Sequence, residues 1–258
     1  MKLKVLMENT ARHPSLTAEH GLSLYIETGD RRLLFDTGAS GAFVQNARKM
    51  GVDLSAVDAL ILSHGHYDHG GGISAFLSCN DRAPVYLSEQ AFGAFYNASG
   101  KYIGLDAKLR DDPRLITLRD RLQLTPDVAV ECCPGAPGKI EPRGLQVLQQ
   151  GKLQPDCFSH ELYLVIRERG KRICFSGCAH RGVENILRWL EPEVFIGGFH
   201  FKDIPADAPG LEEAAAELLA RRCEYYTCHC TGQAQYDRLK QIMGSRLHRL
   251  STGDHMEI

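Results

Sequence analysis

Four residues that can bind a metal ion lie within one short segment, His64-Gly65-His66-Tyr67-Asp68-His69. His64 and His66 are two positions apart, so both can turn toward one ion while Asp68 and His69 turn toward a second. Neutral imidazoles and carboxylates are ligands that borderline divalent metals such as zinc accept. Eleven histidines in 258 residues give such a cluster only rarely by chance. The segment therefore predicts one or two divalent ions, zinc first, with iron or manganese as alternatives.

The elements around this segment are expected to place it at the end of a buried strand. The apolar run 57–62 directly precedes the histidines and predicts that strand. Earlier apolar runs predict a strand and then a hairpin across the Gly29-Asp30 turn, followed by a helix that stops at Gly51. The predicted ranges are strands 3–7, 22–27 and 32–35 and a helix at 41–50.

The second half of the chain repeats this order loosely, with a hairpin, a polar loop and a helix. Two similar halves favour two sheets packed face to face with helices outside, in a single domain spanning residues 1–258. Prolines and glycines interrupt the pattern between about 88 and 155, which predicts an insertion or cap. The predicted later elements are strands 161–167, 172–175, 194–196 and 224–227 and helices 183–190, 211–222 and 234–243.

Composition limits the partners. The formal charge of −2 and the pI near 6.6 give no basic face, so no nucleic acid or membrane surface is expected as a partner. The chain has no apolar run long enough for a membrane span and no signal-type start. Nine cysteines, an odd number, favour a reducing compartment. We expect a cytoplasmic protein with a small-molecule substrate, and the sequence leaves its oligomeric state open.

The pattern His-x-His-x-Asp-His after an apolar strand resembles the signature of the metallo-β-lactamase superfamily. This resemblance implies an α/β fold, the αββα sandwich, in which two mixed β-sheets pack together with helices outside. The segment Leu34-Phe35-Asp36-Thr37-Gly38 matches the family's upstream motif. By that match Asp36 supports the histidine loop and fixes the orientation of the ligands instead of binding metal itself.

The resemblance also implies ligands from the later strand ends. His160 matches the family's next histidine and would complete a set with His64 and His66. In Ser176-Gly177-Cys178 a cysteine stands where the family usually has aspartate. A thiolate can bind the second ion, although Cys178 could instead be a buried structural thiol.

Two histidines compete for the last ligand position. The resemblance favours His229, which follows the final helix–strand unit, and then leaves His200 beside the site as a proton donor or substrate contact. The Cys-x-Cys around His229 lacks the second cysteine pair that a zinc knuckle needs. The expected metal ligands are therefore His64, His66, Asp68, His69, His160, Cys178 and His229.

One branch of the superfamily is most similar, the one named after 7,8-dihydropterin-6-methyl-4-(β-D-ribofuranosyl)aminobenzene-5′-phosphate synthase. The similarity extends over nearly the whole chain and includes His20 and His180, for which substrate contact is expected. The matching segments are 19–23, 158–161, 177–182, 197–200 and 228–232.

The function implied is a metal-dependent hydrolase or lyase in which a metal-bound hydroxide, oriented by Asp68, attacks a small phosphorylated or pterin-like metabolite. Two other classes stay open: an iron-dependent oxygenase on the same fold, and a metal-containing binding or sensing protein without turnover. Basic residues of the insertion could hold a phosphate, although a mixed charge run is more often a solvated face. They are Lys101, Lys108, Arg110, Arg114, Arg119 and Arg121.

Overall fold

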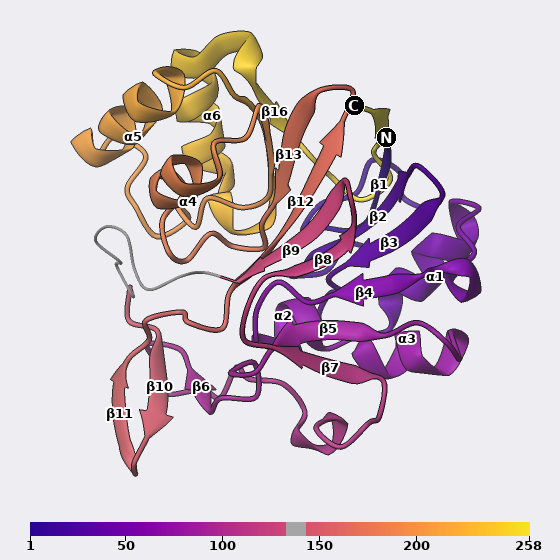
Figure 1. Cartoon of the computed structure of the whole chain (residues 1–258). Helices are drawn as coiled ribbons and strands as arrows, with labels where there is room; N and C mark the ends of the chain where they lie inside the picture. Colours follow the sequence, from indigo (N-terminus) through magenta and orange to yellow (C-terminus); the bar gives the residue numbers. More distant parts are fainter. Residues whose placement is uncertain (133–142) are drawn as a thin grey trace.

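Two seven-stranded mixed sheets form the centre of the molecule (Figure 1). The computed structural model describes residues 1–132 and 143–258. The first sheet has the order β17 (His255–Glu257), β1 (Lys2–Met7), β2 (Ser23–Thr28), β3 (Arg31–Phe35), β4 (Ala59–Ile61), β5 (Val85–Ser88) and β7 (Leu115–Leu118). The second has the order β16 (Leu247–Arg249), β15 (Glu224–Thr227), β14 (Val194–Ile196), β13 (Lys171–Phe175), β12 (Leu162–Glu168), β9 (Val128–Cys132) and β8 (Leu122–Thr125).

The core between the sheets follows from strand alternation. Side chains point alternately to the two faces of a strand, so Leu24 and Ile26 of β2 face the second sheet while Tyr25 faces the helices outside. Phe35 and Phe175 meet across the two sheets with ring centroids 6.0 Å apart. The burial of these apolar side chains is the main force that holds the two sheets together.

Helices cover the outer face of each sheet, as Figure 1 shows. α1 (Ala42–Lys49) and α3 (Ile73–Cys79) pack on the first sheet, and α4 (Val183–Leu190), α5 (Pro209–Leu219) and α6 (Gln233–Met243) pack on the second. In α4, Val183, Ile186, Leu187 and Leu190 are buried while Arg188 is exposed, the helical spacing of one apolar face. The predicted αββα sandwich is confirmed.

Short helices fill several connections: α2 (Tyr67–Gly70), η1 (Leu54–Ala56), η2 (Ala107–Leu109), η3 (His229–Thr231) and η4 (Gly244–Arg246). The helix 183–190 and the strands 194–196 and 224–227 are present with the predicted bounds. In the described part of the chain, no helix has both the length and the apolar character needed to cross a bilayer.

The segment expected as an insertion or cap at about 88–155 divides among three sheets. Its β7 extends the first main sheet, and β8 and β9 extend the second. β6 (Phe95–Tyr96), β10 (Gln146–Gln149) and β11 (Lys152–Pro155) form a separate three-stranded sheet beside them (Figure 1). Residues 133–142 of this segment lie outside the described residues.

Candidate metal centre

The candidate residues converge because they follow strands that run in the same direction. β3 pairs with β4 in parallel, and β13, β14 and β15 pair in parallel with one another. The carboxyl ends of parallel strands meet at one edge of a sheet. The loops after these strands carry the candidate residues: Asp36, His64, His66, Asp68, His69, Cys178, His180, His200 and His229.

Three buried histidines form the first group of possible ligands. The rings of His64, His66 and His180 lie within 4.6 to 5.0 Å of one another. The Nε2 atoms of His64 and His66 and both ring nitrogens of His180 have no hydrogen-bond partner among the described residues. The Cys178 thiol lies close enough to share one ion with His64 and His180. A buried polar atom left unpaired costs about 1–3 kcal/mol, so this arrangement is unfavourable unless a ligand satisfies it.

The protonation states of this first group suit a cation. Burial and the neighbouring histidines lower the pKa of His64 and of His180 well below the usual range. Burial, followed by His160, lowers the pKa of His66 to about 3. All three imidazoles are therefore neutral at pH 7, the form in which histidine binds a metal.

The second group brings His69, His229 and Cys178 together. The two Nε2 atoms are 3.2 Å apart, and the Cys178 Sγ lies 3.3 Å from Nε2 of His69. Asp68 joins them, with Oδ2 3.3 Å from Nε2 of His229. Atoms bound to one zinc ion at about 2.0–2.3 Å lie roughly 3.3–3.7 Å apart in tetrahedral geometry. The spacing is therefore close to that of a ligand set.

The hydrogen bonds of the two imidazoles show which atoms carry lone pairs. Nδ1 of His69 lies 2.6 Å from a carboxylate oxygen of Asp36, and Nδ1 of His229 lies 2.8 Å from Oδ1 of Asn9. Both acceptors are satisfied when each Nδ1 carries the proton, which leaves Nε2 unprotonated in the neutral ring. The two Nε2 atoms lie 3.2 Å apart, a contact that is unfavourable unless a proton or a metal cation lies between them.

Two carboxylates place negative charge at this second group. Burial lowers the pKa of His69, but Asp36 and Asp68 outweigh it and raise that pKa to about 9. Burial raises the pKa of Asp68, but the contacts of its carboxylate with His20 and His229 outweigh that effect and hold the Asp68 pKa well below its usual range. The surroundings therefore favour one positive charge here, which a divalent ion would supply. The donor set fits such an ion.

Asp36 holds the loop that carries the first histidines. Its Oδ1 accepts the backbone N–H of Ser63 at 2.7 Å, and its Oδ2 accepts the Ser63 hydroxyl at 2.7 Å as well as His69 Nδ1. The residue is fully buried and in a left-handed conformation, with φ 61°. Such strained backbone persists only where surrounding contacts fix it, typically at functional sites.

The structure places His160 differently from the other predicted ligands. Its Nδ1 accepts the backbone N–H of Gly65 at 2.9 Å, and its Nε2 lies 3.1 Å from Oδ2 of Asp156. Both ring nitrogens thus have protein partners, although His160, Asp156 and His66 are close enough to form a group of their own. His180, expected as a substrate contact, instead lies with its free nitrogens beside His64 and Cys178.

A cleft of about 130 Å³ reaches members of both groups and is also lined by His20, His200 and Lys202. The candidate ligands that line it are His66, Asp68, Cys178, His180 and His229. The His20 ring lies 4.6 Å from the His229 ring, and its Nε2 is 3.3 Å from Oδ2 of Asp68. His200 packs against His180, with ring centroids 4.3 Å apart. A second hollow of about 300 Å³ shares His180 and His200 with this cleft.

Several supporting residues were not identified from the sequence. Glu8 accepts the backbone N–H of His229 at 2.7 Å. Glu161, fully buried, accepts the backbone N–H groups of His180 and Arg181 and the Tyr163 hydroxyl. The sequence contains a signal for Glu8, because it is a polar residue directly after the apolar strand β1. The loop with His64 likewise follows an apolar strand. Asn9 and Asp156 were also missed.

The family comparison agrees with this geometry. The model of the metallo-beta-lactamase superfamily matches residues 16–228, so the chain belongs to that superfamily. Most members of this superfamily are metal-dependent hydrolases.

Individual relatives cover almost the full length. The solved structure of Tm1679, described as a metal-dependent hydrolase of the β-lactamase superfamily, has a TM-score of 0.83 and 27% identity over 100% of this chain and 99% of that one. An uncharacterised protein of Methanocaldococcus jannaschii is 26% identical over 93% of this chain and 94% of its own length. The 7,8-dihydropterin-6-methyl-4-(beta-D-ribofuranosyl)-aminobenzene-5'-phosphate synthase of the same organism is 25% identical over 98% and 95%.

Proposed function

We propose that the protein is a binuclear metal-dependent hydrolase that acts on a small, anionic metabolite. The observation that carries the proposal is the convergence of lone-pair nitrogen and sulfur atoms in two groups that share Cys178. His64, His66 and His180 would hold the first ion. His69, His229 and Asp68 would hold the second, with Cys178 between the two. A divalent ion, when bound, supplies Lewis acidity and lowers the pKa of water toward 7.

The residues over the two groups then have separate tasks. Asp68 lies at the mouth between His20 and His229, so its carboxylate can orient an attacking water molecule and accept its proton. Burial, followed by the nearby cations Arg143 and Lys202, lowers the pKa of His200 to about 3. His200 is therefore neutral at pH 7, and its N–H can donate a hydrogen bond to an oxygen on which negative charge develops.

Cations around the cleft favour a substrate that carries negative charge. Lys202 lines the cleft, and the Lys101 ammonium lies 5.5 Å over the ring of Tyr67, which also lines it. Arg143 lies 5.6 Å over the ring of Phe201 and donates to the backbone carbonyl of His200. A phosphate ester fits this charge, and the synthase relative from M. jannaschii carries a phosphate in its name. The neighbouring hollow of about 300 Å³ offers room for the rest of a small metabolite.

The test combines metal analysis with a substrate panel. Protein purified from its own host should contain one to two equivalents of zinc, iron or manganese, and His64→Ala combined with His66→Ala should empty the first site. The rate of hydrolysis should be measured for phosphomonoesters, phosphodiesters, lactones and thioesters, with the parent protein and with Asp68→Asn. Hydrolysis of phosphoesters that depends on both metal and Asp68 supports the proposal. Full metal content in the double variant, or turnover that consumes oxygen, contradicts it.

A further inference from the structure

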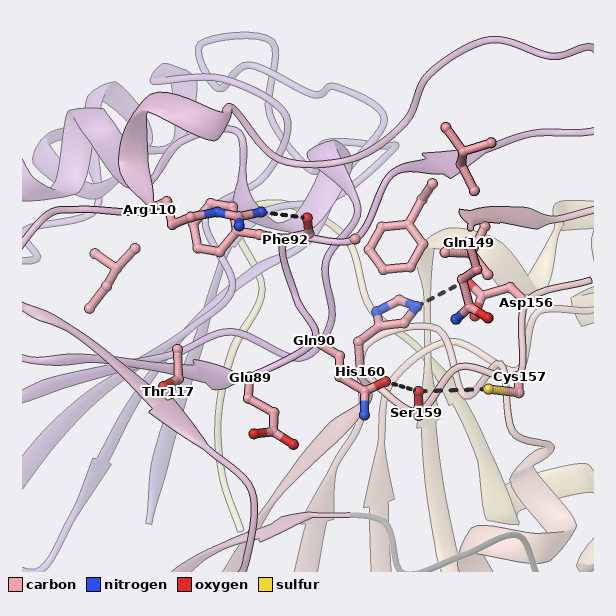
Figure 2. Close-up of a pocket in the computed structure, with 15 residues that line it drawn as sticks. Glu89, Gln90, Phe92, Arg110, Thr117, Gln149, Asp156, Cys157, Ser159 and His160 are labelled. Atoms are coloured by element: carbon pink, nitrogen blue, oxygen red, sulfur yellow. Dashed lines mark hydrogen bonds and ion pairs between the residues drawn. The ribbon is translucent and has the colours of Figure 1, made fainter. Parts of the chain in front are cut away.

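A larger hollow of about 470 Å³ is lined by His160, Arg110 and Phe92 among other residues (Figure 2). This hollow and the metal cleft have no lining residue in common. Phe95 and His160 line the larger one, and their rings are in contact, with centroids 4.1 Å apart and planes tilted by 31°. His66, which lines the metal cleft, lies 5.3 Å from His160 on the other side of this layer. We call the larger cavity the outer hollow.

The charges that line the outer hollow are unbalanced. The carboxylate of Glu89 is paired with Arg119 at 3.0 Å. Asp156 is paired with His160 and also accepts a backbone N–H. Arg110 donates one N–H to the backbone carbonyl of Phe92 at 3.0 Å, and no carboxylate of the described residues lies within ion-pair distance of it. Since a guanidinium has five N–H donors, Arg110 keeps free donors for an anion.

The walls of the outer hollow favour a flat apolar body. The Arg110 guanidinium lies 5.4 Å over the ring of Phe92, which orients it. Val147 and Leu148 of β10 line another wall, and Leu148 is 40% exposed. The amide of Gln90 lies at the rim, hydrogen-bonded to Ser159 (Figure 2). Planar rings pack well on such aromatic and aliphatic surfaces.

We propose that the outer hollow is a second binding site, for a small planar-ring anion. The ring would pack between Phe92 and Leu148, and its carboxylate or phosphate would accept hydrogen bonds from Arg110. Charge-assisted bonds of this kind, which Arg can make in pairs, are about twice as strong as neutral ones. The site goes beyond the proposed hydrolase function, because it lies outside the metal cleft and does not depend on turnover.

Cys157 provides a local reporter of occupancy. It lines the outer hollow, and it is the one exposed thiol among the described cysteines. Benzoate and phenyl phosphate serve as probes, which distinguish a carboxylate from a phosphate ligand. Either probe should slow the alkylation of Cys157 by iodoacetamide at least tenfold at saturation, measured by peptide mass spectrometry on the metal-loaded protein. Alkylation of Cys79, on α3, should not change.

Matched variants and probes test separately whether protection depends on the charge of Arg110, on the aromatic ring of the probe, and on the outer hollow instead of the metal cleft. Arg110→Gln should weaken protection at least tenfold, while Lys108→Gln, an exposed cation nearby that does not line the hollow, should leave it unchanged. Benzamide and cyclohexanecarboxylate should each protect less than benzoate. Protection should persist in Lys202→Gln, which alters only the metal cleft. Equal protection in Arg110→Gln, with its thermal unfolding unchanged, would overturn the proposal, as would the absence of protection by both probes in the parent.

Discussion

His180→Ala and His160→Ala should have opposite effects on metal binding and on stability. We expect His180→Ala to remove one ligand of the first ion. Structural zinc sites bind with about 10–16 kcal/mol shared by four ligands, so one ligand contributes about 2.5–4 kcal/mol, or roughly a 10²- to 10³-fold weaker Kd. Without metal, the variant should be nearly as stable as the parent. It loses the stacking of His180 on Phe158, at a ring distance of 4.5 Å, but removes two unpaired buried nitrogens.

His160→Ala instead breaks two buried hydrogen bonds, to Asp156 and to the N–H of Gly65. Each group left unpaired costs about 1–3 kcal/mol, so the metal-free protein should lose about 2–6 kcal/mol of unfolding free energy. The affinity for the first ion should fall less, by about 10–100-fold, which is the usual effect of removing a residue that supports metal ligands.

The assay measures both quantities on each variant. Competition with a chelator gives the Kd of the first ion, and urea unfolding of the chelated protein at pH 7 gives the stability. The parent and His13→Ala, on an exposed loop, are the controls. The reasoning is refuted if His160→Ala loses the first ion at unchanged stability while His180→Ala binds metal like the parent.

The other predictions concern the second ion and its support. Cys178→Ser should weaken binding of the second ion more than binding of the first, because the thiol lies 3.3 Å from His69 Nε2. Cys178→Asp should retain metal binding. Equal metal content in the parent and the serine variant would show that Cys178 is a structural residue. His229→Ala should lose the second ion, whereas His200→Ala should keep both ions and turn over substrate more slowly. Metal analysis and initial rates measured on both variants test this. Asp36→Asn should weaken metal binding about 10–100-fold, since its amide cannot accept from both Ser63 and His69, and an unchanged Kd argues against that role.

The fold was largely predictable because its signals are local. The helix 183–190 has its apolar residues at helical spacing, and the strand 194–196 is a short apolar run, so neither depends on distant contacts. Between about 88 and 155, prolines and glycines interrupt the periodic pattern, so the sequence predicts an insertion there but not its individual short strands. β7 and β8 are edge strands of the two main sheets, and β9 lies next to β8. These strands have only four or five residues each, too few for a clear periodic pattern.

From the residues alone, the candidate site was predictable only as far as its members are adjacent in sequence. Asp36, Cys178 and His229 were expected from the family resemblance, and the structure places them beside His69. The segment 64–69 places its four residues together because the chain itself does so. The choice between His160 and His180 depends on which ring nitrogens are free, and that is decided by Asp156, Gly65 and Glu161, which meet only in the folded chain. The family resemblance placed His160 with His64 and His66, and its role as a ligand stays a prediction.

The same contacts that fix the site also explain why it needs a ligand. The left-handed backbone at Asp36, Ala179, His200 and His229 is strained, and the buried nitrogens of the first group are unpaired. The surrounding network sustains this cost: Glu8 holds the His229 backbone and Glu161 holds the His180 backbone. A site that is rigid before an ion binds loses little entropy when it does. Metal binding should therefore stabilise the folded chain by relieving these unpaired groups, so that folding and metal affinity are coupled at this one edge of the two sheets.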